Sequence, residues 1–277
     1  MVVYCTKPEA ARLMPAWSTI DGSVPLPAEM TLLVVTGVIA GALNVVAGGG
    51  SFLTLPLLLF LGLPAPVANA SNRVGVLAQN VSGLWTFHRY GVIDWRWSLL
   101  VSLPALAGAA AGAWLSLVVS AAAFTRILSF AMLGVTIWSV AGRRGRSPST
   151  APASASSGSS PPIGPLVLLG FLLVGVYGGF VQAGVGFFLL AITSACGIDL
   201  LRGNAVKLLV VLIITLLSLG IFASAGTVDW VRGGALAAGN FAGGVLGARL
   251  ALLKGQQWLE RVVTATVIVF AVLLLLQ

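Results

Sequence analysis

The sequence has few charged residues and very few side chains suited to catalysis. Of its 277 residues only 8% are charged, with seven Asp and Glu and a single histidine, His88. Its two cysteines, Cys5 and Cys196, lie far apart and form no CxxC pair. Because hydrolytic, redox and metal sites need clusters of such groups, the sequence predicts no enzyme, no cofactor and no metal site.

What the sequence has in abundance is apolar residues. They make up 58% of the chain, and the mean hydropathy is +1.04. Stretches such as 30–47, 97–120 and 231–253 reach or approach the roughly 20 residues that a helix needs to cross a bilayer. Since backbone amides in lipid must be satisfied within their own segment, we predict an all-α integral membrane protein.

The basic residues indicate an orientation and no nucleic-acid partner. The formal net charge is +8, yet Lys and Arg occur singly at segment ends or in one bridge and form no stripe. Arg143, Arg144 and Arg146 place that bridge on the cytoplasmic side, because positive residues accumulate there. We therefore predict a multi-pass protein of the bacterial inner membrane, in contact with membrane lipid.

The chain reads as two homologous repeats. Nine landmarks recur 135 positions later: Gly91, Asp94, Trp95, Ala107, Gly108, Gly112, Ala113, Leu115 and Leu117 return as Gly226, Asp229, Trp230, Ala242, Gly243, Gly247, Ala248, Leu250 and Leu252. The organisation that follows is a polar N-terminal tail over 1–29 with no cleaved signal, a first transmembrane repeat over 30–141, a flexible cytoplasmic linker over 142–165 and a second repeat over 166–277.

Each repeat holds four to five apolar segments, and one is short. The segments 50–63 and 184–198 have only about 14 residues, or roughly 21 Å of helix, which favours interrupted or re-entrant helices. Five crossings per half would invert the second repeat relative to the first. Four crossings plus a re-entrant piece would leave the halves parallel, and the charges agree with both arrangements.

A glycine cluster precedes each short segment. Glycines let the backbone turn and expose N–H groups, and the helix that follows adds positive partial charge, so the pattern predicts an anion cradle. The alternative is close packing of helices through small residues. The candidate binding residues here are Asn44, Gly48, Gly49, Gly50, Gln182, Gly184 and Gly186.

A second group of candidates begins the helix after each short segment. Arg73 and Lys207 stand at the start of long apolar runs, where a cation must pair, face water or snorkel to the headgroups. A small anionic substrate would supply the counter-ion. The candidate residues are Asn69, Asn72, Arg73, Asn204 and Lys207.

Three polar residues further along the first of these helices have no counterpart in the second repeat. Gln79, Asn80 and Ser82 are replaced at the same offset by Ile214, Thr215 and Leu217. The asymmetry fits either substrate discrimination or a hydrogen bond between helices.

These patterns together resemble the sulfite exporter TauE/SafE family, also called the toluene sulfonate uptake family, over about 32–276. The resemblance rests on Gly48-Gly49-Gly50-Ser51-Phe52-Leu53 with Pro56, on Pro64 and Ala70-Ser71-Asn72, on Arg89-Tyr90-Gly91 with Asp94, and on Gly108 to Leu115. It implies an inner-membrane permease for small anions such as sulfite, sulfoacetate or thiosulfate, with proton coupling in some members.

The expected function is therefore a secondary transporter or exporter of small, sulfur-containing anions that works by alternating access between the two repeats. A non-transporting membrane assembly or scaffold protein, in which the glycines serve packing alone, is the alternative. An oligomer is compatible with either.

Overall fold

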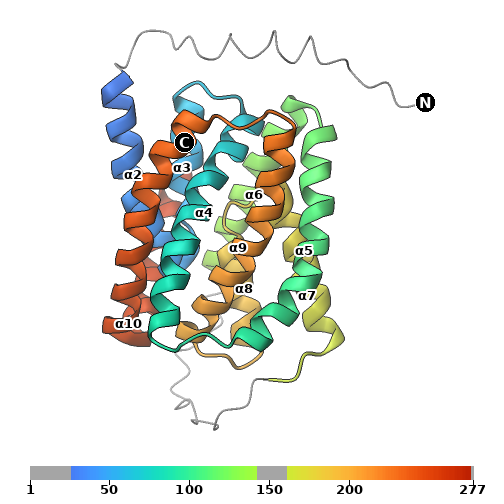
Figure 1. Ribbon diagram of the computed structural model, residues 1–277, viewed down its shortest axis with the longest axis vertical. Helices are drawn as coiled ribbons and strands as arrows, with labels where there is room; N and C mark the ends of the chain where they lie inside the picture. Colours follow the sequence, from blue (N-terminus) through green and yellow to red (C-terminus); the bar gives the residue numbers. More distant parts are fainter. Residues whose placement is uncertain (1–25, 142–160, 276–277) are drawn as a thin grey trace, which may run out of the picture.

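The computed structural model describes residues 26–141 and 161–275, and its regular elements in these ranges are all helices (Figure 1). In chain order they are α2 (Leu26–Ala47), α3 (Ser51–Phe60), α4 (Ala65–Arg89), α5 (Trp95–Val118), α6 (Ala121–Ala141), α7 (Pro165–Phe180), α8 (Val185–Ala195), α9 (Leu200–Ser224) and α10 (Trp230–Leu275). The predicted all-α class is confirmed.

Four helices are long and apolar enough to cross a membrane by themselves: α2, α5, α9 and the Trp230–Lys254 part of α10. The 25-residue helix α4 is equally long but more polar, and it carries buried Asn69, Asn72, Arg73, Gln79 and Asn80. These side chains face the bundle interior, so α4 is a polar helix within an apolar bundle.

The short segments form short helices. Helix α3 has 10 residues and α8 has 11, so each is only about 15–17 Å long. The stretch 231–253 lies within a longer element, α10, which runs from Trp230 to Leu275.

Helices α4 and α9, which occupy matching places in the predicted repeats, run in opposite directions (Figure 1). Arg73, near the start of α4, lies over the ring of Phe222, near the end of α9, at 4.8 Å from the ring centroid. Gly83, late in α4, lies against Leu208, early in α9. Opposite directions are what the inverted alternative predicts for the repeats.

Glycines bring the two halves of the chain into close contact. Gly108 and Gly112 of α5 face the backbone of α7, and Gly243 and Gly247 of α10 face the backbone of α2. A Cβ at Gly247 would lie only 2.6 Å from the carbonyl oxygen of Ala42. Each first helix therefore packs on the fourth helix of the other predicted repeat through small residues, and the halves interlock.

A buried ion-pair cluster joins the starts of α2 and α10. Arg232 donates from Nε to Glu29 Oε1 and from Nη1 to Asp229 Oδ2, both at 2.6 Å. Glu29 is fully buried, whereas the sequence placed it in a polar tail that precedes the first apolar segment at 30. Glu29 lies within α2, and Arg232 neutralises its buried carboxylate.

Candidate functional site

The two interrupted helix pairs meet at their breaks. Between α2 and α3 the chain turns at Gly48, which has φ +85°, and between α7 and α8 it turns at Gln182 and Gly184, with φ +64° and +71°. A Cβ on Gly48 would lie 2.7 Å from the backbone of Gly186. The breaks of the two predicted repeats thus touch in the bundle interior.

Lys207 caps the end of α2 at this meeting point. Its Nζ donates to the carbonyl oxygens of Asn44 and Val45 at 2.9 and 2.7 Å and to Asn204 Oδ1 at 2.6 Å. Asn204 also donates from Nδ2 to the carbonyl oxygen of Val46 at 3.3 Å. All three ammonium hydrogens have an acceptor, and the positive charge lies at the negative end of the helix dipole.

Arg73 and Asn69 cap the C-terminal end of α7 in the same way, by donating to its last carbonyl oxygens. Arg73 donates from Nη2 to the carbonyl oxygen of Gly179 at 2.7 Å, and Asn69 donates from Nδ2 to that of Phe180 at 3.0 Å. Arg73 is fully buried. Each cation therefore binds the broken helix of the other predicted repeat, and neither reaches the headgroups.

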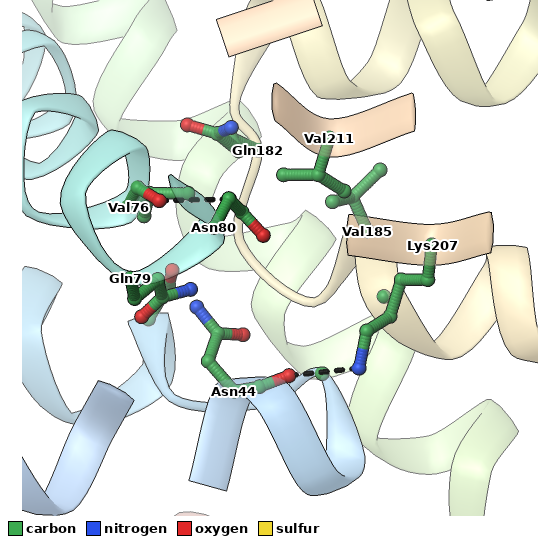
Figure 2. Close-up of a pocket in the computed structure, with 11 residues that line it drawn as sticks. Asn44, Val76, Gln79, Asn80, Gln182, Val185, Lys207 and Val211 are labelled. Carbon is green, nitrogen blue, oxygen red and sulfur yellow. Dashed lines mark hydrogen bonds between the residues drawn. The ribbon is translucent and has the colours of Figure 1, made fainter. Parts of the chain in front are cut away.

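A small polar cavity lies where the breaks meet (Figure 2). Its volume is about 10 Å³, which is room for about one water molecule. Amide side chains converge on it from α2, α4 and the α7–α8 break, and Lys207 lies beside it (Figure 2). The lining residues are Asn44, Gly48, Ser51, Val76, Gln79, Asn80, Gln182, Val185, Gly186, Lys207 and Val211.

The cavity has a positive electrostatic character. Lys207 is the one ionisable residue in its lining, which contains no carboxylate. The first turns of α3 and α8 also reach it, through Ser51, Val185 and Gly186. Amides in the first turn of a helix lack intrahelical acceptors and carry the positive end of the dipole, so both short helices direct positive partial charge toward the cavity.

The structure brings together some of the predicted site residues and places others behind them. Those that line the cavity are Asn44, Gly48, Gln182, Gly186 and Lys207. Gly49, Gly50 and Gly184 form the breaks, where Gly50 N donates to Asn44 Oδ1 at 3.3 Å. Asn69, Asn72, Arg73 and Asn204 bind neighbouring elements outside the lining.

Asn72 shows what these outer residues do. It accepts a hydrogen bond from Thr54 Oγ1 at 2.6 Å and donates from Nδ2 to Ser51 Oγ at 3.4 Å. Both partners belong to α3, so Asn72 holds the short helix against α4.

Gln79 and Asn80, which were not among the predicted site residues, line the cavity. Asn80 donates from Nδ2 to the carbonyl oxygen of Val76 in its own helix at 2.7 Å, and its oxygen points into the cavity (Figure 2). The sequence distinguished Gln79 and Asn80 only in one way: the second repeat has no amide at the matching positions. At the matching place in α9, Thr215 accepts a hydrogen bond from Gln182 Nε2.

Over the ranges 26–141 and 161–275 we find no group of three or more His, Cys, Asp or Glu residues that could hold a metal ion. The chemistry available at the site is therefore that of amides, hydroxyls, helix ends and one ammonium group.

Comparisons with known proteins place these features in a family. The family model for sulfite exporter TauE/SafE matches residues 33–274. A "Probable membrane transporter protein ORF9" of Sinorhizobium sp is 27% identical over 247 residues, which cover 89% of this chain and 92% of that protein. The "Probable membrane transporter protein YfcA" of Escherichia coli K12 is 26% identical over 89% of this chain and 88% of its own length. A "Probable membrane transporter protein" of Haemophilus influenzae is 25% identical over 82% and 87%. No solved structure matches the chain.

Proposed function

The chain belongs to the sulfite exporter TauE/SafE family, and we propose that it carries a small sulfur-containing anion through the cavity beside Lys207. Family and relatives make it a multi-pass membrane transporter and not an enzyme, and a bacterial inner membrane fits its bacterial relatives. The proposal adds the substrate class, the binding residues and the way in which the site opens.

One observation carries the proposal: the cavity between two helix breaks contains a lysine and no carboxylate. A sulfite or sulfonate group would accept hydrogen bonds from the amides of Asn44, Gln79 and Gln182 and from the first-turn N–H groups of α3 and α8. Interrupted helices in matching positions are a common build for transporter sites.

The observed conformation is closed around this site. A cavity of about 10 Å³ does not admit an anion of several heavy atoms, so the two breaks must separate before the substrate enters. Gly48 and Gly186 are where they touch. Movement of one predicted repeat against the other would open the contact toward each side of the membrane in turn.

Lys207 would couple binding to this movement. Its present acceptors are two carbonyl oxygens at the end of α2 and the side chain of Asn204. When the end of α2 moves away, the ammonium group loses its two carbonyl acceptors, keeps Asn204 in its own helix, and gains an anionic oxygen in their place. Arg73 stands outside the lining and serves to hold the end of α7.

Uptake by proteoliposomes tests the transport activity itself. We expect the purified protein to accumulate labelled sulfite, sulfoacetate or a taurine-like sulfonate above empty vesicles. Uptake that equals that of empty vesicles for every anion would favour the scaffold alternative.

Asn80 allows a test of the site that leaves the packing intact. Its side chain bonds only within its own helix among the described contacts, so Asn80→Ala removes a cavity amide without breaking a link between helices. The second N–H of Asn80 has no acceptor among the described contacts, and we propose that it donates to the anion in the opened site. We therefore expect substrate binding to weaken roughly 10- to 100-fold, the effect of one hydrogen bond to a charged group. The measurement is the KM for uptake together with the thermal stability of the purified variant.

Thr86→Ala is the matched control for this change. Thr86 lies six residues further along α4, is buried and donates to the carbonyl oxygen of Ser82 four residues before it, but it lies outside the cavity lining. An equal change in KM for both variants would contradict the proposed site.

A further inference from the structure

A groove on the outer surface of the bundle lies between α5 and α9, away from the central cavity. Its volume is about 330 Å³, and apolar side chains line nearly all of it. Leu99, Leu100 and Leu103 are 48%, 46% and 64% exposed, so this wall faces the surroundings of the bundle. The apolar lining consists of Leu99, Leu100, Leu103, Leu106 and Ile213.

Arg96 forms one end of this groove. It lies in the first turn of α5, is exposed, and has no ion pair with any residue of the described ranges. The carboxylate nearest in sequence, Asp94, accepts a hydrogen bond from Trp97 N, and Asp199 at the start of α9 pairs with Arg202. Among the described residues, Arg96 therefore has no carboxylate within ion-pair distance.

The length of the groove matches one leaflet of a bilayer. From Arg96 to Leu106 the helix rises by ten residues, or about 15 Å, which is half of the roughly 30 Å hydrocarbon core. Arg96 therefore lies at headgroup depth when Leu106 lies near the bilayer centre. A chain of methylenes from one leaflet fills such a groove along its whole length.

The electrostatics favour an anionic headgroup. His88 and Arg89 lie in the last turn of α4, at the same end of the bundle as Arg96. Trp97 in α5 donates from Nε1 to the carbonyl oxygen of Pro161, so this end is also the one where the second described range begins. The positive residues of the linker predict that this end is cytoplasmic, and the cytoplasmic leaflet carries a negative surface potential.

We propose that an anionic diacyl phospholipid of the cytoplasmic leaflet binds here, with its phosphate on Arg96 and one acyl chain in the α5–α9 groove. The site is separate from the substrate cavity, so the lipid proposal stands or falls independently of transport. Fixing a lipid between α5 and α9 would brace the face of the bundle on which α5 contacts both α7 and α9.

Native mass spectrometry of the full chain tests the proposal. The protein is equilibrated in detergent with equimolar phosphatidylglycerol and phosphatidylcholine, and the retained lipids are counted. We expect preferential retention of phosphatidylglycerol, and we expect Arg96→Gln to lower it about fivefold, the contribution of one basic residue near an anionic surface. Retention of phosphatidylcholine should not change in this variant.

Two further variants distinguish binding in the groove from nonspecific attraction of anionic lipid to any exposed arginine. Leu103→Trp fills the groove from a lipid-facing position and should lower phosphatidylglycerol retention although Arg96 is intact. Arg126→Gln removes an exposed arginine at the other end of the bundle and should have no effect. Equal retention of both lipids by the wild type, equal losses from Arg96→Gln and Arg126→Gln, or full retention by Leu103→Trp would each overturn the proposal.

Discussion

At the scale of single residues, the cations decide how the site is built. The sequence showed Arg73 and Lys207 at the start of apolar runs without a nearby carboxylate, and an anionic substrate was the predicted counter-ion. In the structure their acceptors are backbone carbonyl oxygens at the ends of α7 and α2. The C-terminal end of a helix carries negative partial charge, so a buried cation can be stabilised there without any acidic side chain.

Gly48 tests how tightly the two breaks meet. Gly48→Ala places a Cβ 2.7 Å from the backbone of Gly186 and also forces alanine to φ +85°. We expect the left-handed backbone to cost about 1–2 kcal/mol and the clash to add roughly 1–3 kcal/mol to the loss in free energy of unfolding. Denaturant titration in detergent measures the sum.

Gly62→Ala is the control for the backbone contribution alone. Gly62 has φ +84°, and a Cβ there would meet nothing within 4 Å. If the two variants lose the same stability, the breaks do not press on each other as described.

At the scale of the elements, the start of α10 repeats the start of α9 in a different environment. Each helix has an aspartate as its N-cap and an arginine three residues later: Asp199 with Arg202, and Asp229 with Arg232. The first pair is exposed, whereas the second is buried and also binds Glu29 of α2. The same local pattern therefore serves as a surface cap in α9 and as an interhelical link in α10.

Removing Arg232 should be far more costly than removing Arg202. Arg232→Ala leaves the buried Glu29 and the partly buried Asp229 without a counter-ion, and we expect a loss of about 3–5 kcal/mol in the free energy of unfolding. Arg202→Ala breaks an exposed pair and should cost at most about 1 kcal/mol. Unfolding curves of both variants in detergent give the comparison.

Glu29→Gln distinguishes a charge effect from lost packing. Combined with Arg232→Met it removes one buried carboxylate together with the arginine, and the double variant should recover part of the stability that Arg232→Met loses alone. No recovery would mean that Glu29 and Arg232 do not stabilise each other.

At the scale of the whole molecule, helices of one half of the chain pack mainly on helices of the other half. Helix α2 packs on α10, and α5 packs on α7, in both cases through glycines that face the partner's backbone. Helices α4 and α9 cross the centre in opposite directions and present Arg73 and Lys207 to opposite breaks. This arrangement suits a transporter that opens toward one side at a time.

The orientation follows if the positive linker is cytoplasmic. In a background with Cys5→Ser and Cys196→Ser, Tyr90→Cys probes the loop between α4 and α5, and Ala121→Cys probes the start of α6 at the other end of the bundle (Figure 1). An impermeant maleimide added to intact cells should label Ala121→Cys only, and permeabilisation should expose Tyr90→Cys. Labelling of both from one side would mean that α5 does not cross.

Part of the candidate site was predictable from the sequence. Glycine clusters before short apolar segments indicated the breaks, because few other residues permit such turns, and they identified Asn44 and Gln182 nearby. Lys207 was identified separately, as a cation at the start of a long apolar run. Gln79 and Asn80 stood out only as an asymmetry between the repeats. Whether an amide in α4 faces the cavity or a neighbouring helix depends on how α4 is rotated, and periodicity in an apolar bundle does not determine that rotation.

The sequence by itself determined that the chain is a helical membrane protein with two interrupted segments. A bilayer imposes this strictly, since length, hydropathy and backbone hydrogen bonding leave one solution for long apolar runs. Tertiary structure alone decided that the breaks touch, that carbonyl oxygens hold the cations, and that Glu29 meets Arg232 203 residues away. Every residue has a carbonyl group, so which one accepts a given hydrogen bond is known only once the helices are packed.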